Sequence, residues 1–206
     1  MTVKPAIGVD VDDVLFATKM LMIRLMNEFL GTNLQIYECH QRRIVDNLGL
    51  TDADEQRFRE SVYPTFRVED IPPMPEALIA LERLRPYYDF VAITARQDRN
   101  REATEISIGR HFPMVSDILY GKCPDPNCGN ADCAKRGSKF DLARGHAVRA
   151  FVDDHEEQFI GWNSGVVTPY CLAHPWNTRL ELVRPDVYRA GWREITVQLL
   201  AHEPTP

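Results

Sequence analysis

Three acidic residues follow the first apolar stretch of the chain, in the sequence AIGVDVDDV. Side chains at positions i and i+2 of a strand point the same way, so Asp10 and Asp12 are expected to converge at one strand end. Two carboxylates held together repel each other, and a divalent cation would relieve that repulsion. Oxygen ligands of this kind suit magnesium. The simpler alternative is a solvated acidic turn in which Asp13 caps the next helix.

Three more features carry residue types that phosphate chemistry uses. Thr94 ends the apolar run VAIT, and its hydroxyl with the following backbone N–H groups could hold a phosphate oxygen. Lys139 lies just inside a predicted helix start, where its charge is unfavourable for the helix dipole, so a partner in the site would explain it. Asp153 and Asp154 end a second apolar run, AFVDD.

Taken singly, each of these features has a structural alternative. Thr94 and the two later acids could cap helices, and most lysines such as Lys139 are exposed surface residues. All four features together, in this order and each at a strand end or a helix start, favour one shared site.

These side chains depend on apolar strands that alternate with helices, the pattern of parallel βαβ units. Strands are predicted at residues 6–11, 89–94, 116–120, 150–152 and 166–171. Helices are predicted at residues 19–30, 52–62, 76–85, 98–111 and 138–146, with a C-terminal helix marked by Trp192, Ile195 and Leu199. Glu55 is expected to complete a capping box. Ligands of such sheets bind beyond the carboxyl ends of the strands, where the acids lie.

One long, mostly helical stretch interrupts the alternation directly after the first strand. We therefore predict an α/β fold, a Rossmannoid parallel sheet flanked by helices, with a small helical cap inserted after the first strand. The predicted core comprises residues 1–15 and 74–206, and the predicted cap comprises residues 16–73. A Cys-rich loop at residues 121–137 is inserted in the core.

The composition excludes several classes of protein. The 206 residues carry a formal net charge of -6, which disfavours a long nucleic-acid partner but allows a small anionic substrate in a locally charged cleft. No segment is apolar enough to span a bilayer, and the N-terminus does not resemble a signal peptide. A cytoplasmic location is expected by default, and a homodimer stays open.

The four features together resemble the haloacid-dehalogenase superfamily, whose four motifs match DVDDV, the Thr of AITAR, Lys139 and Asp153-Asp154. The resemblance covers roughly residues 5–171. It implies a Rossmann-like core with a cap, magnesium, and chemistry through an aspartyl phosphate. Asp13 stands where many members of the superfamily have Gly.

The resemblance also implies roles for individual residues. Asp10 would attack phosphorus, and Asp12 would first protonate the leaving oxygen and then activate water. Magnesium would be held by Asp10, the backbone carbonyl of Asp12, and Asp153 or Asp154. Thr94 and Lys139 would stabilise the charge of the transferred group.

A looser likeness points to the 5'(3')-deoxyribonucleotidase branch of the superfamily. It is carried by the cap after DVDDVLF, the segment PPMPEALIALERL, HPWN and GWREI. It implies a nucleoside monophosphate as the substrate. Phe16 could stack on a base or simply pack between cap and core. Further contacts to phosphate or sugar are candidates at Ala95, Arg96, Arg42, Arg43 and Arg67.

Three cysteines, Cys123, Cys128 and Cys133, recur at C-x4-C-x4-C. A structural zinc is one interpretation, with a fourth ligand from His111, His146, Cys39 or His40; free thiols and a disulfide are the others. Competing functions are a phosphatase for nucleic-acid ends or phosphosugars, and a non-catalytic, zinc-bearing binding module on the same scaffold.

Overall fold

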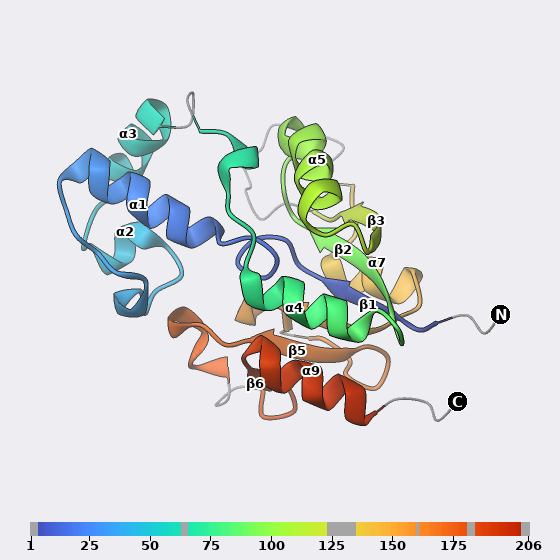
Figure 1. The fold of residues 1–206 in the computed structure, drawn as a ribbon. Helices are drawn as coiled ribbons and strands as arrows, with labels where there is room; N and C mark the ends of the chain where they lie inside the picture. Colours follow the sequence, from blue (N-terminus) through green and yellow to red (C-terminus); the bar gives the residue numbers. More distant parts are fainter. Residues whose placement is uncertain (1–3, 63–65, 123–134, 160, 181–183, 203–206) are drawn as a thin grey trace.

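In the described part of the chain, six parallel strands form one sheet in the order β3-β2-β1-β4-β5-β6 (Figure 1). The computed structural model describes residues 4–62, 66–122, 135–159, 161–180 and 184–202. The strands are β1 (Ala6–Val9), β2 (Asp89–Thr94), β3 (Val115–Tyr120), β4 (Val148–Asp153), β5 (Thr168–Leu172) and β6 (Tyr188–Ala190). β1 lies between β2 and β4, so residues that follow these three strands emerge side by side. The predicted α/β fold is confirmed.

Helices cover both faces of the sheet. The core helices are α4 (Pro75–Leu84), α5 (Arg101–His111), α7 (Lys139–Gly145) and α9 (Trp192–Ala201). Leu81 of α4, Ile108 of α5 and Ile195 of α9 belong to one buried cluster, and Ala143 of α7 packs with Phe151 in another. Strand side chains alternate between the two clusters, which places α7 on the face opposite the other three helices.

Between β1 and β2 the chain forms α1 (Thr18–Leu30), α2 (Ile44–Asn47) and α3 (Asp52–Val62), which lie together to one side of the sheet (Figure 1). The chain enters and leaves this region along adjacent paths. The N–H of Ala17 donates to the carbonyl of Pro72 at 2.9 Å, and the N–H of Met74 donates to the carbonyl of Leu15 at 2.8 Å. These bonds lie at the bounds predicted for the cap, residues 16–73, which remain a prediction.

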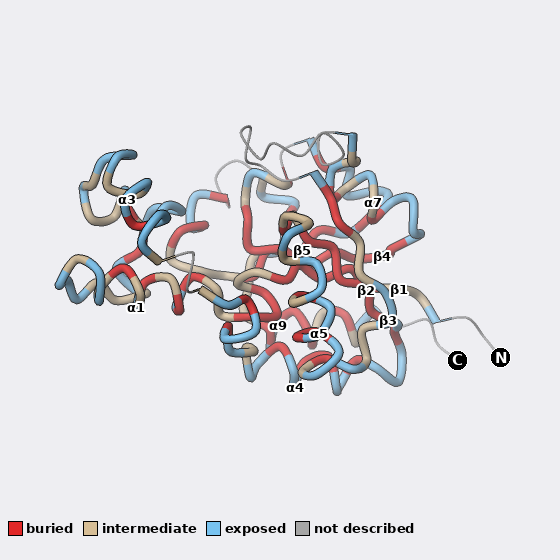
Figure 2. The backbone as a smooth tube through the Cα atoms, turned by 90° about the horizontal axis from the view of Figure 1, so that it is seen from above, coloured by how far each residue is buried: buried red, intermediate tan, exposed pale blue. Residues whose placement is uncertain are grey.

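The cap has a small apolar cluster of its own. Met26, Val45 and Phe58 come from its three helices and are buried together. Most residues of the sheet are buried, whereas the outer turns of the cap are exposed (Figure 2). Gly31 ends α1 with a φ of 67°, a conformation that glycine adopts without strain.

Several element bounds differ from the prediction. β6 was not predicted, because three half-exposed residues give too short a pattern. β1 ends at Val9 rather than at residue 11, and a 3-10 turn, Asp98–Asn100, precedes α5.

The capping box of α3 lies one residue earlier than predicted. The backbone N–H and the hydroxyl of Thr51 donate to Oδ2 of Asp54 at 2.8 and 2.7 Å. Glu55 instead forms ion pairs with Arg43 and Arg59. None of the helices in the described residues has the length and apolar character needed to cross a bilayer.

Candidate active site

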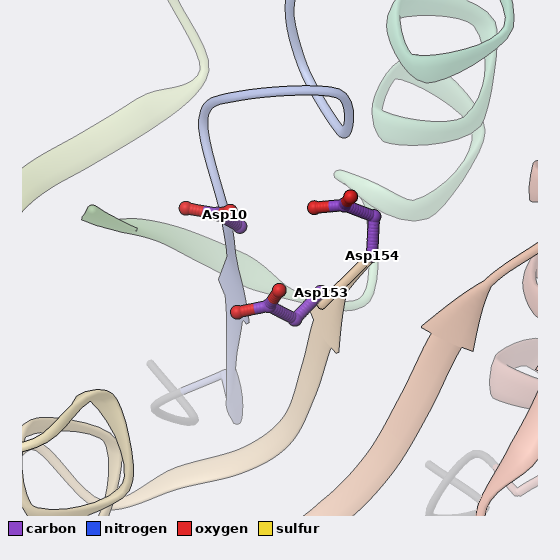
Figure 3. Close-up of side chains that lie close together, drawn as sticks. All are labelled: Asp10, Asp153 and Asp154. Atoms are coloured by element: carbon purple, nitrogen blue, oxygen red, sulfur yellow. The ribbon is translucent and has the colours of Figure 1, made fainter. Parts of the chain in front are cut away.

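Three carboxylates meet at the carboxyl edge of the sheet (Figure 3). Asp10 follows β1, Asp153 is the last residue of β4, and Asp154 comes next. One carboxylate oxygen from each residue lies within 4.8 Å of the other two, and all three residues are buried. The structure thus brings two distant segments of the chain to one point, because β1 and β4 are neighbours.

Lys139 is the counter-ion of this cluster. Its Nζ lies 2.8 Å from Oδ2 of Asp10 and 2.8 Å from Oδ2 of Asp153, and its side chain is 6% exposed. Ser138 fixes the start of α7, since its hydroxyl accepts the N–H of Asp141 at 3.2 Å. The two ion pairs outweigh the unfavourable placement of a cation at a helix start.

One ammonium does not neutralise three buried carboxylates. Burial raises the pKa of Asp10 to about 7 and the pKa of Asp154 to about 6, and it also raises the pKa of Asp153. Burial disfavours the charge of Lys139 too, yet Asp10 and Asp153 hold its pKa above the usual value. A hard divalent cation among the three oxygens would remove the repulsion, so the donor set fits magnesium.

Asp12 pairs with a different cation. Its carboxylate accepts from Nε and Nη2 of Arg96 at 3.0 and 2.7 Å and from the hydroxyl of Thr18 at 2.5 Å. Burial would raise the pKa of Asp12, but Arg96 and Thr18 hold it below the usual value. The strand-based reason for placing Asp12 beside Asp10 is wrong, because β1 ends at Val9 and neither acid lies in it.

Asp13 occupies the turn that follows. Its φ of 57° is left-handed, which Asp tolerates better than most residues. Its Oδ1 accepts the backbone N–H of Lys19 at 2.7 Å, close to the start of α1. This contact matches the helix-capping alternative.

The segment after β5 forms a second layer around the acids. The indole Nε1 of Trp176 donates to Oδ2 of Asp154 at 2.9 Å, and the amide of Asn177 donates to the Asp154 carbonyl at 2.8 Å. Nε2 of His174 lies 2.8 Å from the carbonyl of Asp13. Sequence reasoning assigned no role to these side chains. The sequence does contain a signal for them, because the aromatic and amide residues of HPWN come shortly after the strand predicted at residues 166–171, at the edge of the sheet where ligands bind.

A cavity of about 390 Å³ connects the carboxylates to the cap. Its core side includes Asp10, Asp12, Asp154, Lys139 and Trp176, with Ala95 and Arg96 from the loop after β2. Its cap side combines apolar and basic side chains with one acid and one hydroxyl, namely Met22, Met26, Ile44, Val45, Phe58, Lys19, Arg42, Arg43, Arg59, Glu55 and Thr18. This size is sufficient for a small ligand.

Other candidates lie outside the lining of this cavity. Phe16 is 1% exposed and packs edge-to-face on Phe112 at 5.3 Å between ring centroids, which is the cap–core packing alternative. Thr94 is buried, and its hydroxyl oxygen accepts the N–H of Arg96 at 3.1 Å. Arg67 is exposed and is not a lining residue.

Cys123, Cys128 and Cys133 lie outside the described residues. Among the proposed fourth zinc ligands, Cys39 is buried in a cluster with Ile23 and Trp176. The predicted zinc site therefore stays a prediction.

Comparison with known proteins matches this geometry to one fold. No protein-family model matches the chain. No curated protein matches its sequence. Among solved structures, 113 chains match. A haloacid-dehalogenase-like hydrolase from Streptococcus pneumoniae has a TM-score of 0.62 and 13% identity, covering 97% of this chain and 98% of that one.

Two further structures have the same architecture. A haloacid-dehalogenase family hydrolase from Deinococcus radiodurans, with bound phosphate and sodium, has a TM-score of 0.61, 15% identity and 96% coverage of both chains. A protein from Haemophilus somnus described as a predicted phosphoglycolate phosphatase has a TM-score of 0.56 and 14% identity, covering 97% of this chain and 99% of that one. At this identity the likeness shows the fold, which is haloacid-dehalogenase-like.

Proposed function

We propose that the protein is a phosphomonoester hydrolase that uses Asp10 as a covalent nucleophile. The observation that carries the proposal is the joint position of Asp10, Lys139, Asp153 and Asp154 at the carboxyl edge of the sheet. A nucleophilic carboxylate needs a nearby cation to approach a phosphate dianion, and this cluster provides one and fits a second. Magnesium, held by the three carboxylates, would supply the remaining positive charge.

In the first step a carboxylate oxygen of Asp10 forms a bond to phosphorus while the ester P–O bond breaks. The leaving oxygen takes a proton from Asp12. In the second step water forms a new bond to phosphorus and gives a proton to Asp12. The bond between phosphorus and the Asp10 oxygen breaks, its electron pair returns to Asp10 as a carboxylate, and inorganic phosphate is released. Lys139 stabilises the negative charge of the transferred phosphoryl group in both steps.

Arg96 sets the protonation of Asp12 in the arrangement described above. The ion pair keeps Asp12 ionised, which suits its role as the base of the second step. To act as the acid of the first step Asp12 must carry a proton, which requires Arg96 to release Asp12 and pair with the substrate phosphate. Arg96 and Asp10 line the same cavity, so a phosphate bound at Asp10 would lie on the side that Arg96 faces.

The proposed substrate is a nucleoside monophosphate. The apolar cap side chains Met22, Met26 and Phe58 line the cavity beyond the carboxylates, where a planar base would find apolar contact. Phosphosugars and nucleic-acid ends remain the alternatives, because the basic cap residues would suit them equally.

The first experiment is hydrolysis of p-nitrophenyl phosphate with and without magnesium. Magnesium-dependent turnover supports the proposal, and a panel of nucleoside monophosphates and sugar phosphates then ranks the substrate classes. Failure to hydrolyse any phosphomonoester would instead favour the non-catalytic binding module.

The zinc prediction is tested by metal analysis of the freshly purified protein and of the Cys128→Ser variant. If the purified wild-type protein contains no zinc, the zinc prediction is wrong.

Trp176→Phe is expected to weaken magnesium binding by about 10- to 100-fold, because residues that orient a metal ligand contribute effects of this size. The change removes the hydrogen bond to Oδ2 of Asp154 but keeps a ring in place. The measurement is the magnesium concentration at half-maximal thermal stabilisation.

Trp162→Phe is the matched control for this prediction. The indole of Trp162 donates to the Val167 carbonyl at 2.8 Å, and this buried side chain is not part of the cavity lining. This control is expected to lower the melting temperature without moving the magnesium midpoint. An unchanged midpoint in Trp176→Phe would show that the indole does not position Asp154.

A further inference from the structure

Two cations on the cap side of the cavity lack an acidic partner. Lys19 and Arg42 both line the cavity, and among the residues that the structure describes neither forms an ion pair. Their basic neighbours differ in this respect. Arg43 pairs with Asp46, Asp52 and Glu55, and Arg59 pairs with Glu55. Two of the four cations that line the cap side of the cavity therefore have no ion-pair partner within the described part of the chain.

Lys19 is the more unusual of the two, because it is a buried lysine at 6% exposure. Its ammonium donates to the carbonyl of Gln41 at 3.2 Å and lies 3.7 Å from the ring centre of Trp176. Burial lowers its pKa to about 8, and Asp13 and Asp154 oppose that shift only in part. A buried ammonium without a carboxylate is costly, so an anionic ligand in the cavity would stabilise it.

Arg42 lines the same cavity as Lys19 and adds a second positive charge to it. Asp154 and His155 line this cavity too, and the charge of Arg42 acts to lower the pKa of Lys19, of Asp154 and of His155. Two like charges that face one cavity repel each other until an anion lies between them. Because Arg42 is exposed, it can also reach an entering ligand.

The transferred phosphoryl group does not require this pair. Lys139 already lies against Asp10, and Arg96 lies in the loop after β2 on the core side of the same cavity. Lys19 and Arg42 come from the cap and line the cavity together with the apolar side chains Met22 and Met26, on the side expected to receive the leaving group.

We propose that Lys19 and Arg42 form a second anion site, so that the preferred substrate is a phosphomonoester whose leaving group carries another carboxylate or phosphate. The inference rests on the proposed phosphatase function and narrows its substrate class. Among nucleotides it makes nucleoside bisphosphates the preferred substrates, and the nucleoside monophosphates proposed above become the weaker substrates of the same site. A charge-assisted contact of this kind contributes about 10- to 100-fold to kcat/KM.

The test compares esters that differ by one anionic group. For the carboxylate the pair is 3-phosphoglycerate and glycerol 3-phosphate, and for the phosphate it is adenosine 3',5'-bisphosphate and adenosine 5'-monophosphate. We expect kcat/KM of the wild type to be at least about tenfold higher for the doubly anionic member of one pair. The pair that responds identifies which anion the site takes.

The variants are Lys19→Met, which keeps the apolar stem, and Arg42→Gln, which changes an exposed residue and leaves the packing intact. Each is expected to lower the ratio of kcat/KM within the responding pair by about 10-fold or more. The ratio cancels any loss common to both substrates. Arg24→Gln is the control, because Arg24 is an exposed cation of the same helix outside the cavity lining, and its ratio should equal that of the wild type.

Three results overturn the inference. One is a wild-type ratio near one in both pairs. Another is an unchanged ratio in Lys19→Met and Arg42→Gln. The third is an equal loss on both members of a pair, which would assign the two cations to the transferred phosphoryl group. Failure of the proposed function is distinct, since the wild type would then hydrolyse neither member of either pair.

Discussion

Asp10→Asn is expected to lower the rate of phosphomonoester hydrolysis by about four orders of magnitude or more, because it replaces the carboxylate that attacks phosphorus in the first step by a neutral amide. An amide is a poor nucleophile and a poor ligand for a hard cation. The side chain volume is unchanged, and Lys139 keeps its second partner, Asp153, at 2.8 Å. The variant should therefore fold, with activity as the property that is lost.

The measurement is kcat with p-nitrophenyl phosphate at saturating magnesium, together with trapping of the phosphorylated chain by rapid acid quench and mass spectrometry. Labelled wild type should carry one phosphoryl group on the peptide that contains Asp10. Asp89→Asn is a matched control, since Asp89 is an exposed residue at the opposite end of β2. Residual activity of Asp10→Asn above about one hundredth of the wild type would contradict a nucleophilic role.

Much of the core was predictable because its signals are local. Apolar runs of four to six residues gave β1, β2 and β4, and Gly31 and Ser138 marked a helix end and a helix start at their own positions. The order in which acids follow strands predicted a shared edge, because parallel strands deliver their carboxyl ends to one side of a sheet. The meeting of Asp10, Asp153 and Asp154 there agrees with that reasoning.

The partners of the acids were not predictable in the same way. Arg96 lies 84 residues from Asp12, and Trp176 lies 22 residues from Asp154, so nothing in the local pattern links them. The turn after β1 also ends the strand two residues early, so Asp10 and Asp12 line the same cavity without the strand alternation that had been expected to place them there. Such contacts depend on tertiary packing, which a single sequence does not encode as a periodicity.

Lys139→Met is expected to have the largest effect on stability. Lys139 bridges Asp10 and Asp153, both buried, and its removal leaves two buried carboxylates without their counter-ion. Breaking a buried pair in this way costs about 3–5 kcal/mol. Methionine retains the volume of the stem, so the loss reports charge rather than a cavity.

The pH dependence identifies the cause of this loss. Lys139 lowers the pKa of Asp10 and of Asp153, so its removal raises both further above their values in the unfolded chain. A carboxyl whose folded pKa is raised favours the folded state when protonated, and this stability is lost as the pH rises through the folded pKa. The difference in unfolding free energy between wild type and Lys139→Met should therefore be small at pH 5 and approach about 3–5 kcal/mol at pH 8.

Urea unfolding at the two pH values, without added metal, measures this difference, and Lys4→Met serves as a control because Lys4 is exposed and remote from the acids. Magnesium should restore more of the lost stability at pH 8 than at pH 5, because a cation competes with protons for the same oxygens. A difference that is equal at both pH values would show that Lys139 contributes packing rather than charge. The position of the Lys139 ammonium would then no longer support a shared site for the cation and the phosphoryl group. The role of Asp10 as the nucleophile would depend on the Asp10→Asn experiment alone.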